Sequence, residues 1–213
     1  MDIEGGPPTL IDGRSARAER TRQAVIEAHI GLIRAGELKP TGVQIASRAG
    51  VSLRSLWGHF GDLETLFAAT GAELMRRHDD AAELVDPALP LDERIDVYCR
   101  LRAEALEFIA PFARSSEIRA PFSRELQRHR MRYFERAARD VQNLFAAEFD
   151  GVDDVVCSQI VQSMAIATTW PMWVSLRDVL RLPVPDAVEV MKRTMSALVS
   201  EAIASPRGVP AGS

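Results

Sequence analysis

The segment from 39 to 60, KPTGVQIASRAGVSLRSLWGHF, constrains the fold more than any other part of the chain. Thr41 and Gln44 stand three residues apart, as in the capping box that starts a helix, and Ser52 is placed to cap a second helix. Gly50 lies between them and is the residue type that a tight turn with positive φ requires. The spacing therefore predicts two short helices joined by a turn at Gly50.

Apolar residues in this segment indicate how the two helices pack. Ala46 is small enough to lie where the helices approach each other, and Leu56 gives the second helix an apolar anchor. The remaining side chains of the second helix would face outward, and the first residues of such a helix can enter the major groove of DNA. The segment is therefore predicted to be a helix-turn-helix. The alternative is an ordinary helical hairpin with a basic face.

Outside this segment the sequence is helical throughout. Apolar residues recur three and four positions apart, as on one face of an α-helix, and no stretch alternates apolar and polar residues as a strand does. Asp62 is placed to cap a long helix that runs to about His78, and Ser123 to cap a later one. The expected fold class is all-α, with eight or nine helices. Glycines and prolines mark the predicted breaks, at Gly36, Pro87, Pro90, Pro111, Pro121, Gly151, Pro183 and Pro185.

The stretch from Val155 to Leu176 has no formally charged residue in 22 positions, which is long enough to cross a bilayer. Its serines, glutamines and threonines favour a helix buried in a core or a subunit interface instead, kinked near Pro171. We expect this helix and the last one, from Asp186 to Ala204, to pair with the same helices of a second copy as a four-helix bundle.

Charge is distributed unevenly along the chain. The part from Arg14 to Phe60 holds eight basic and three acidic residues, a net charge of +5, whereas the whole chain has −4. A basic head on an acidic body favours a local site for a polyanion. The two cysteines, Cys99 and Cys157, provide neither a disulfide framework nor a cysteine-rich zinc module, which is typical of a reducing compartment. We expect buried thiols rather than a redox switch, and a cytoplasmic protein.

The run from Arg22 to Leu66 resembles the DNA-binding domain of the TetR family of transcriptional repressors. The resemblance implies a homodimer with two N-terminal DNA-reading heads, each followed by a larger helical domain that binds a small molecule and forms the dimer. Two positions depart from the family pattern, since Trp57 replaces a tyrosine and Leu63 replaces a lysine that generally touches a phosphate. The matching residues are Arg22, Val25, Ile26, Ala28, Leu32, Ile33, Gly36, Ile45, Ala46, Ala49, Gly50, Val51, Ser52, Leu56, His59, Phe60, Glu64 and Leu66.

The resemblance and the predicted breaks together divide the chain into five parts. Residues 1–13 and 205–213 are expected to be disordered tails. Between them we expect the helix-turn-helix DNA-binding domain over 14–61, a connecting helix over 62–79, and the helical ligand-binding and dimerisation domain over 80–204.

DNA contacts are assigned to the two short helices. Thr41 resembles the family's phosphate contact at the start of the first of them. Arg54 and Ser55 begin the recognition helix and are expected to contact base edges, since an arginine fork matches guanine O6 and N7. The alternative for Arg54 is a phosphate clamp. The full predicted set is Thr41, Ser52, Arg54, Ser55, Trp57 and His59, with Trp57 and His59 on the sugar-phosphate backbone; the alternative for His59 is a capping or core role.

A small-molecule site would be mostly apolar with a few polar groups, although each such residue can equally be plain core. If Arg102 or Arg119 points inward, the ligand is expected to be anionic. The predicted ligand-binding residues are Tyr98, Leu101, Arg102, Phe112, Phe134, Met164, Thr168 and Trp173.

Two further groups have weaker interpretations. Arg124, Arg128, Arg132 and Arg136 recur every four residues as a basic stripe, either an anion contact or a solvated face partly neutralised by nearby acids. His78, Asp79 and Asp80 are a poor metal-ligand set, because adjacent helical residues point apart.

The sequence as a whole indicates a DNA-binding regulator. It shows no catalytic motif, so we expect no enzyme, no cofactor and no metal. The function that it favours is a transcriptional repressor released from a palindromic operator by a small-molecule effector. The alternative is a helical protein-interaction module that no longer binds DNA.

Overall fold

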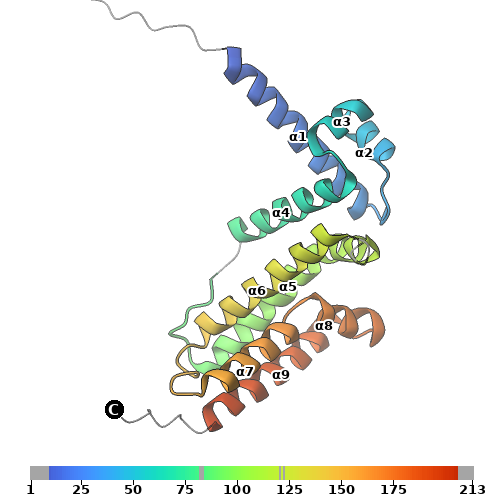
Figure 1. Cartoon of the computed structure of the whole chain (residues 1–213). Coiled ribbons are helices and arrows are strands. Elements are labelled where there is room, and N and C mark those ends of the chain that lie inside the picture. The colour runs from blue at the N-terminus through green and yellow to red at the C-terminus, as the bar shows by residue number, and fades with distance from the viewer. Residues whose placement is uncertain (1–9, 82–83, 120, 122, 206–213) are drawn as a thin grey trace, which may run out of the picture. The chain divides into compact units, whose positions relative to one another are not determined.

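The computed structural model describes residues 10–81, 84–119, 121 and 123–205. The expected N-terminal tail lies outside the described residues up to position 9, and of the expected C-terminal tail only Ser205 is described. All regular elements in these ranges are helical, which confirms the predicted all-α class (Figure 1). They are α1 (Leu10–Arg34), α2 (Gly42–Ala49), α3 (Leu53–Phe60), α4 (Leu63–Ala81), α5 (Leu91–Arg119), α6 (Arg124–Leu144), α7 (Asp154–Ala167), α8 (Trp170–Val174), the π-helix η2 (Ser175–Val179) and α9 (Val184–Ala204).

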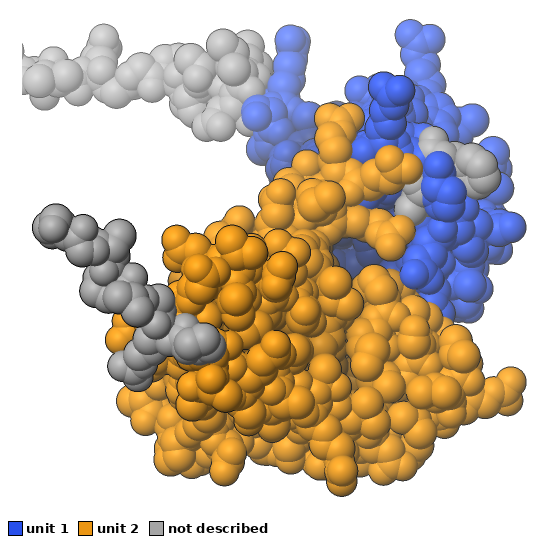
Figure 2. All heavy atoms as spheres, turned by 60° about the horizontal axis from the view of Figure 1, so that its bottom comes forward, with its two compact units in different colours: residues 1–76, 111–126 blue, residues 77–110, 127–213 orange. Residues whose placement is uncertain are grey.

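The chain forms two compact units (Figure 2). Unit 1 comprises residues 1–76 and 111–126, and unit 2 comprises residues 77–110 and 127–213. This division differs from the expected domain limits, because unit 1 takes most of α4 and the end of α5 in addition to the first three helices. The first helix also begins at Leu10, within the stretch expected to be a tail.

The core of unit 1 is built by the apolar positions that the helical spacing predicts. Val25, Ile45, Leu56 and Leu66 have no exposed surface, and they come from α1, α2, α3 and α4 respectively. Local caps fix where these helices begin. The backbone N–H of Thr65, for example, donates to Asp62 Oδ1 at 2.7 Å, as predicted for an N-cap.

The break predicted at Pro111 is wrong, because α5 continues through this proline to Arg119. An internal proline removes one helical hydrogen bond and costs about 3 kcal/mol. Packing in unit 1 offsets this cost: the Phe112 ring lies 5.7 Å from the Phe67 ring, and Ser115 Oγ donates to the Leu38 carbonyl at 2.7 Å. Pro111 is instead the residue at which α5 passes from unit 2 into unit 1.

The uncharged stretch is not one kinked helix, as predicted, but three short elements. The first, α7, ends at Ala167, where the hydroxyl of Thr168 donates to the Met164 carbonyl at 2.9 Å. Pro171 then lies in the first turn of α8, a position that favours starting a new helix. Among the described residues, no helix combines the length and the apolar character needed to span a bilayer.

Unit 2 is held together along α5, α7 and α9. Helices α7 and α9 lie side by side (Figure 1), and the side chains of Met164 in α7 and Met191 in α9 are completely buried. Arg94 of α5 closes the carboxyl end of α6, since its guanidinium donates to the Leu144 carbonyl at 2.9 Å and to Glu148 at 2.6 Å. Cys99 is fully buried, which raises the pKa of its thiol to about 12 and keeps it protonated.

Candidate nucleic-acid interface

The start of α2 has the capping box that its sequence predicts. The Gln44 backbone N–H donates to Thr41 Oγ1 at 3.3 Å, and the Thr41 backbone N–H donates to Gln44 Oε1 at 2.8 Å. Thr41 itself is exposed. The reciprocal bonds fix the first turn of α2 and leave Thr41 at the surface, where its predicted phosphate contact is sterically open.

Gly50 makes the predicted turn between α2 and α3. Its backbone has φ 67° and ψ 30°, the left-handed conformation in which a Cβ is unfavourable. The N–H of Val51 donates back to the Ala46 carbonyl at 3.0 Å. Ser52 then caps α3 by accepting from the Ser55 N–H at 3.1 Å. The predicted local architecture of this segment, with its turn and both caps, is therefore confirmed.

The α3 helix keeps one face inside and presents the other to solvent. Leu56 and Phe60 are buried at 0% and 3% exposure. Arg54 is exposed, and its side chain forms no hydrogen bond or ion pair with any residue that the structure describes. Of the other predicted DNA contacts on this segment, Ser52 is exposed, whereas Ser55, Trp57 and His59 are half-buried.

Trp57 is held against the first residue of α2. A Cβ built on Gly42 would overlap the six-membered ring of Trp57 and would lie 3.3 Å from Leu53 Cδ1. Gly42 therefore lets the indole close over the start of α2. This role of Gly42 was not predicted from the sequence. The available signal was a glycine at the first helical position of α2, where a side chain would normally be tolerated.

The interior of unit 1 contains a histidine that was not predicted to matter. His29 is completely buried, with its Nδ1 2.8 Å from Thr70 Oγ1 and its ring in edge contact with Phe67 at 4.5 Å. Burial, and secondarily the positive charge of Arg119, lower the pKa of His29 to about 4. This imidazole is therefore neutral near pH 7 and joins α1 to α4 as a packing residue.

Arg119 belongs to this same unit and not to the predicted ligand-binding residues of unit 2. Its guanidinium lies 5.1 Å from the centre of the Phe67 ring and donates to the Pro40 carbonyl at 3.5 Å. Phe112 is also in unit 1. The structure thus places these two residues beside the core of the predicted head.

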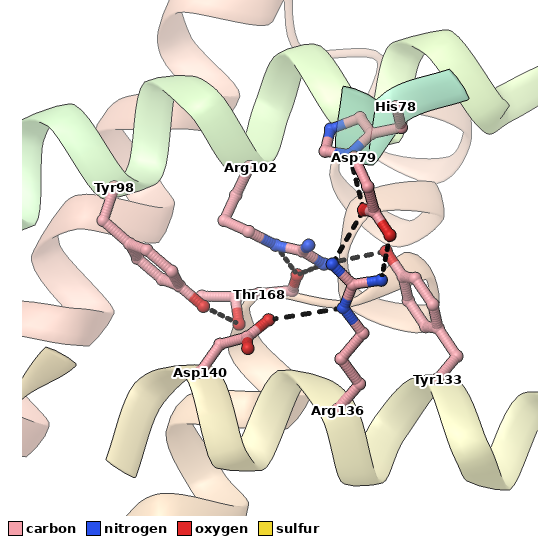
Figure 3. Close-up of polar contacts among 8 residues, drawn as sticks. All are labelled: His78, Asp79, Tyr98, Arg102, Tyr133, Arg136, Asp140 and Thr168. Carbon is pink, nitrogen blue, oxygen red and sulfur yellow. Dashed lines mark hydrogen bonds and ion pairs between the residues drawn. The ribbon is translucent and has the colours of Figure 1, made fainter. Parts of the chain in front are cut away.

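In unit 2, three predicted ligand-binding residues meet in one polar cluster (Figure 3). Arg102 donates to the Thr168 carbonyl through Nε at 3.1 Å and through Nη2 at 2.8 Å. Tyr98 lies with its hydroxyl 3.4 Å from Thr168 Oγ1, and burial raises the pKa of this phenol. Arg102 also donates to the hydroxyl of Tyr133 at 2.8 Å. Tyr133 was missed, because no spacing rule links it to a residue 31 positions earlier.

The remaining predicted ligand-binding residues of unit 2 differ in burial. Met164 and Trp173 are buried, and Trp173 Nε1 donates to Glu107 at 2.8 Å. Leu101 and Phe134 are half-buried.

An ion pair borders this cluster (Figure 3). Arg136, the last member of the basic stripe, binds Asp79 through two hydrogen bonds of 2.6 and 2.7 Å and lies 3.8 Å from Asp140. The guanidinium of Arg136 holds the pKa of Asp79 below its usual value. Asp79 is therefore engaged in an ion pair, and no group of three or more candidate metal ligands occurs within the part of the chain that the structure describes.

Comparisons with known proteins rest on structure alone, since no protein-family model and no curated protein sequence matches this chain. A TetR transcription regulator from Haloarcula marismortui ATCC 43049 is 18% identical, with a TM-score of 0.62 over 87% of this chain and 97% of that chain. A transcriptional regulator from Rhodococcus sp. Rha1 is 14% identical, with a TM-score of 0.61 over 89% of this chain and 99% of that chain. The chain therefore has a helix-turn-helix head within an all-α protein. Its fold is that of TetR transcription regulators, as the resemblance of Arg22 to Leu66 implied.

Proposed function

We propose that this protein is a sequence-specific DNA-binding transcriptional regulator and has no enzymatic role. The observation that carries the proposal is the exposed face of α3, which starts at a capped Ser52 and presents an unpaired Arg54 above a fully buried Leu56. A rigid short helix with a free guanidinium in its first turn suits readout of guanine in the major groove. A cytoplasmic location follows from this proposal.

Selection of bound sequences from a random duplex pool tests the proposal, with affinities then measured by gel shift. Arg54→Ala is expected to weaken binding to the selected sequence by roughly 1–3 kcal/mol, which is about 5- to 150-fold, and to relax specificity at one position. Binding to random DNA should change far less. Equal weakening on both duplexes would make Arg54 a phosphate clamp, and failure of the wild-type chain to select any sequence would favour the alternative, a protein-interaction module.

We infer that the regulator is a homodimer that pairs through α7 and α9. From Val155 onward the exposed residues of α7 carry no charge, and Val155 and Ile166 keep 64% and 54% of their surface exposed. A helix face in permanent contact with water usually carries charged residues. A second copy would cover this face, and the two recognition helices would then need to lie about 34–36 Å apart to read a palindrome.

A charge placed on this face tests the dimer. Ser163 is exposed on α7, so Ser163→Arg is expected to convert the dimer to a monomer in light scattering. Asn143→Arg, at an exposed position of α6, is the matched control and should leave the mass unchanged. An unchanged mass of the Ser163→Arg variant would place the dimer contact elsewhere.

We further infer that the regulator is a repressor, released by an effector that is a small organic anion bound near Arg102. This guanidinium donates to the Thr168 carbonyl and the Tyr133 hydroxyl, and it has no hydrogen bond to a carboxylate among the residues that the structure describes. Arg102 is half-buried, and a cation partly removed from water with neutral hydrogen-bond partners is costly, so a carboxylate ligand would compensate its charge. An effector that prefers a conformation with another head spacing lowers operator affinity by linkage.

Paired ligands test the effector proposal. Aromatic and aliphatic carboxylates are titrated into the operator complex beside their neutral amides, with fluorescence anisotropy as the readout. Release by a carboxylate and not by its amide is expected, and Arg102→Gln should remove the difference. Operator affinity that stays constant at saturating carboxylate would reject induction by an anion.

A further inference from the structure

Helix α1 extends, at its amino-terminal end, beyond the residues that pack in the core of unit 1. Residues 13–20 are all exposed, and Val25 is the first residue of the described part of α1 that is buried. In Figure 1 these first turns project beyond α2 and α3. Helices of this length gain most of their stability from an apolar face packed on a neighbour. Residues 13–20, here called the arm, bury no such face against the described part of unit 1.

The arm is basic along one side. Arg14, Arg17 and Arg20 recur every three residues, so they fall within about 120° around the helix axis. Glu19 is the one acidic residue of the arm. The three guanidiniums make no ion pair or hydrogen bond with any described residue, and intramolecular contacts therefore do not account for their presence.

The chemistry of the arm fits a row of phosphates. Arginine binds phosphate through paired, charge-assisted hydrogen bonds. The three arginines span about 9 Å of helix axis, and three successive phosphates rise about 7 Å along one DNA strand, a difference that flexible arginine side chains can accommodate. The arm also belongs to the same compact unit as the recognition helix α3.

We propose that Arg14, Arg17 and Arg20 form a second DNA-binding surface, which contacts the phosphate backbone next to the groove that α3 occupies. This rests on the proposed function, because the partner is the same duplex. The arm adds affinity without sequence preference, whereas Arg54 adds preference for particular bases. The two surfaces are therefore separable by experiment.

The test replaces all three arginines with alanine, a residue that keeps the helical propensity of the arm. Binding of the full-length Arg14→Ala/Arg17→Ala/Arg20→Ala variant to the selected duplex and to a scrambled duplex is followed by fluorescence anisotropy from 50 to 300 mM KCl. The slope of log K against log salt concentration is expected to decrease in magnitude by about 2.7 for each arm on the duplex, or about 5.4 for a dimer with two arms, since each phosphate contact contributes about 0.9. The ratio of the two affinities should stay the same.

A control that also removes exposed arginines, two instead of three, comes from α6 in unit 2. Arg130 and Arg139 are exposed, and the Arg130→Ala/Arg139→Ala variant should keep the wild-type slope. If the wild-type chain binds DNA and the arm variant keeps its slope, the arm proposal is overturned while the proposed function stands. Loss confined to the selected duplex, or a change in oligomer mass with unchanged DNA affinity, also overturns it. A wild-type chain that binds no duplex overturns the proposed function and the arm with it.

Discussion

His29 gives unit 1 a pH dependence whose size follows from its surroundings. Because burial and Arg119 lower its pKa from 6.5 to about 4, the folded protein disfavours the protonated imidazole. The unfolded chain binds this proton near pH 6.5, and the folded chain only near pH 4. The stability contributed by neutral His29 is therefore complete above pH 6.5 and is lost as the pH falls toward 4.

These two pKa values correspond to a loss of about 2 kcal/mol in the free energy of unfolding between pH 7.5 and pH 5. For a unit of this size the loss amounts to roughly 8–16 °C in melting temperature. Other groups titrate in the same range, so the quantity of interest is the difference between two variants measured at the same pH.

His29→Leu isolates this difference. Leucine removes the titrating group, and the Thr70 hydroxyl still has the Leu66 carbonyl as acceptor at 2.8 Å. Thermal unfolding at pH 7.5, 6.5 and 5.0 is expected to show the additional loss in the wild-type chain and in a His59→Gln control, but not in His29→Leu. If His29→Leu loses as much stability as the wild type between pH 7.5 and 5, the buried imidazole is not the cause.

Four glycine substitutions test the turn and the packing of the short helices. Gly50→Ala should lower the free energy of unfolding by about 1–2 kcal/mol in urea denaturation, because the residue has a positive φ, whereas Gly58→Ala, with open space at its Cβ, should raise it by about 0.8–1 kcal/mol. Gly42→Ala should displace the Trp57 ring, with a cost of about 1–3 kcal/mol and a shift in indole emission. Gly31→Ala meets the flexible end of an arginine and should leave the emission unchanged. Equal changes in stability for Gly50→Ala and Gly58→Ala, or equal changes in indole emission for Gly42→Ala and Gly31→Ala, would contradict the packing described.

The parts of the fold that the sequence predicts are those decided within one or two helical turns. The capping box at Thr41, the cap at Ser52 and the turn at Gly50 depend on residues at most five positions apart, and all three are present. The buried faces of α1 and α4 follow from helical periodicity in the same way. Such features can be predicted without knowing which helices pack together in the folded protein.

The parts that could not be predicted depend on contacts between distant residues. Arg102 meets Tyr133 and Thr168, which are 31 and 66 positions away, and no spacing rule selects these partners. His29 is one of four scattered histidines in the sequence, and its neutral state results from Thr70, Phe67 and Arg119, which other helices bring to it. Burial and partners, rather than residue type, decide what these side chains do.

At Pro111 the rule that proline ends a helix predicts a helix break, but the structure has a boundary between compact units there instead. The proline costs α5 a hydrogen bond, and taken alone this favours a helix end. The residues after Pro111 are held by unit 1 through the ring of Phe112 and the hydroxyl of Ser115. The helix therefore continues through the proline despite the lost hydrogen bond. The position is nonetheless a boundary, because α5 changes from one compact unit to the other at this residue. One continuous helix thus carries both Arg102 and Ser115, thirteen positions apart in the sequence. Arg102 belongs to the polar cluster of unit 2, and Ser115 binds the Leu38 carbonyl within unit 1.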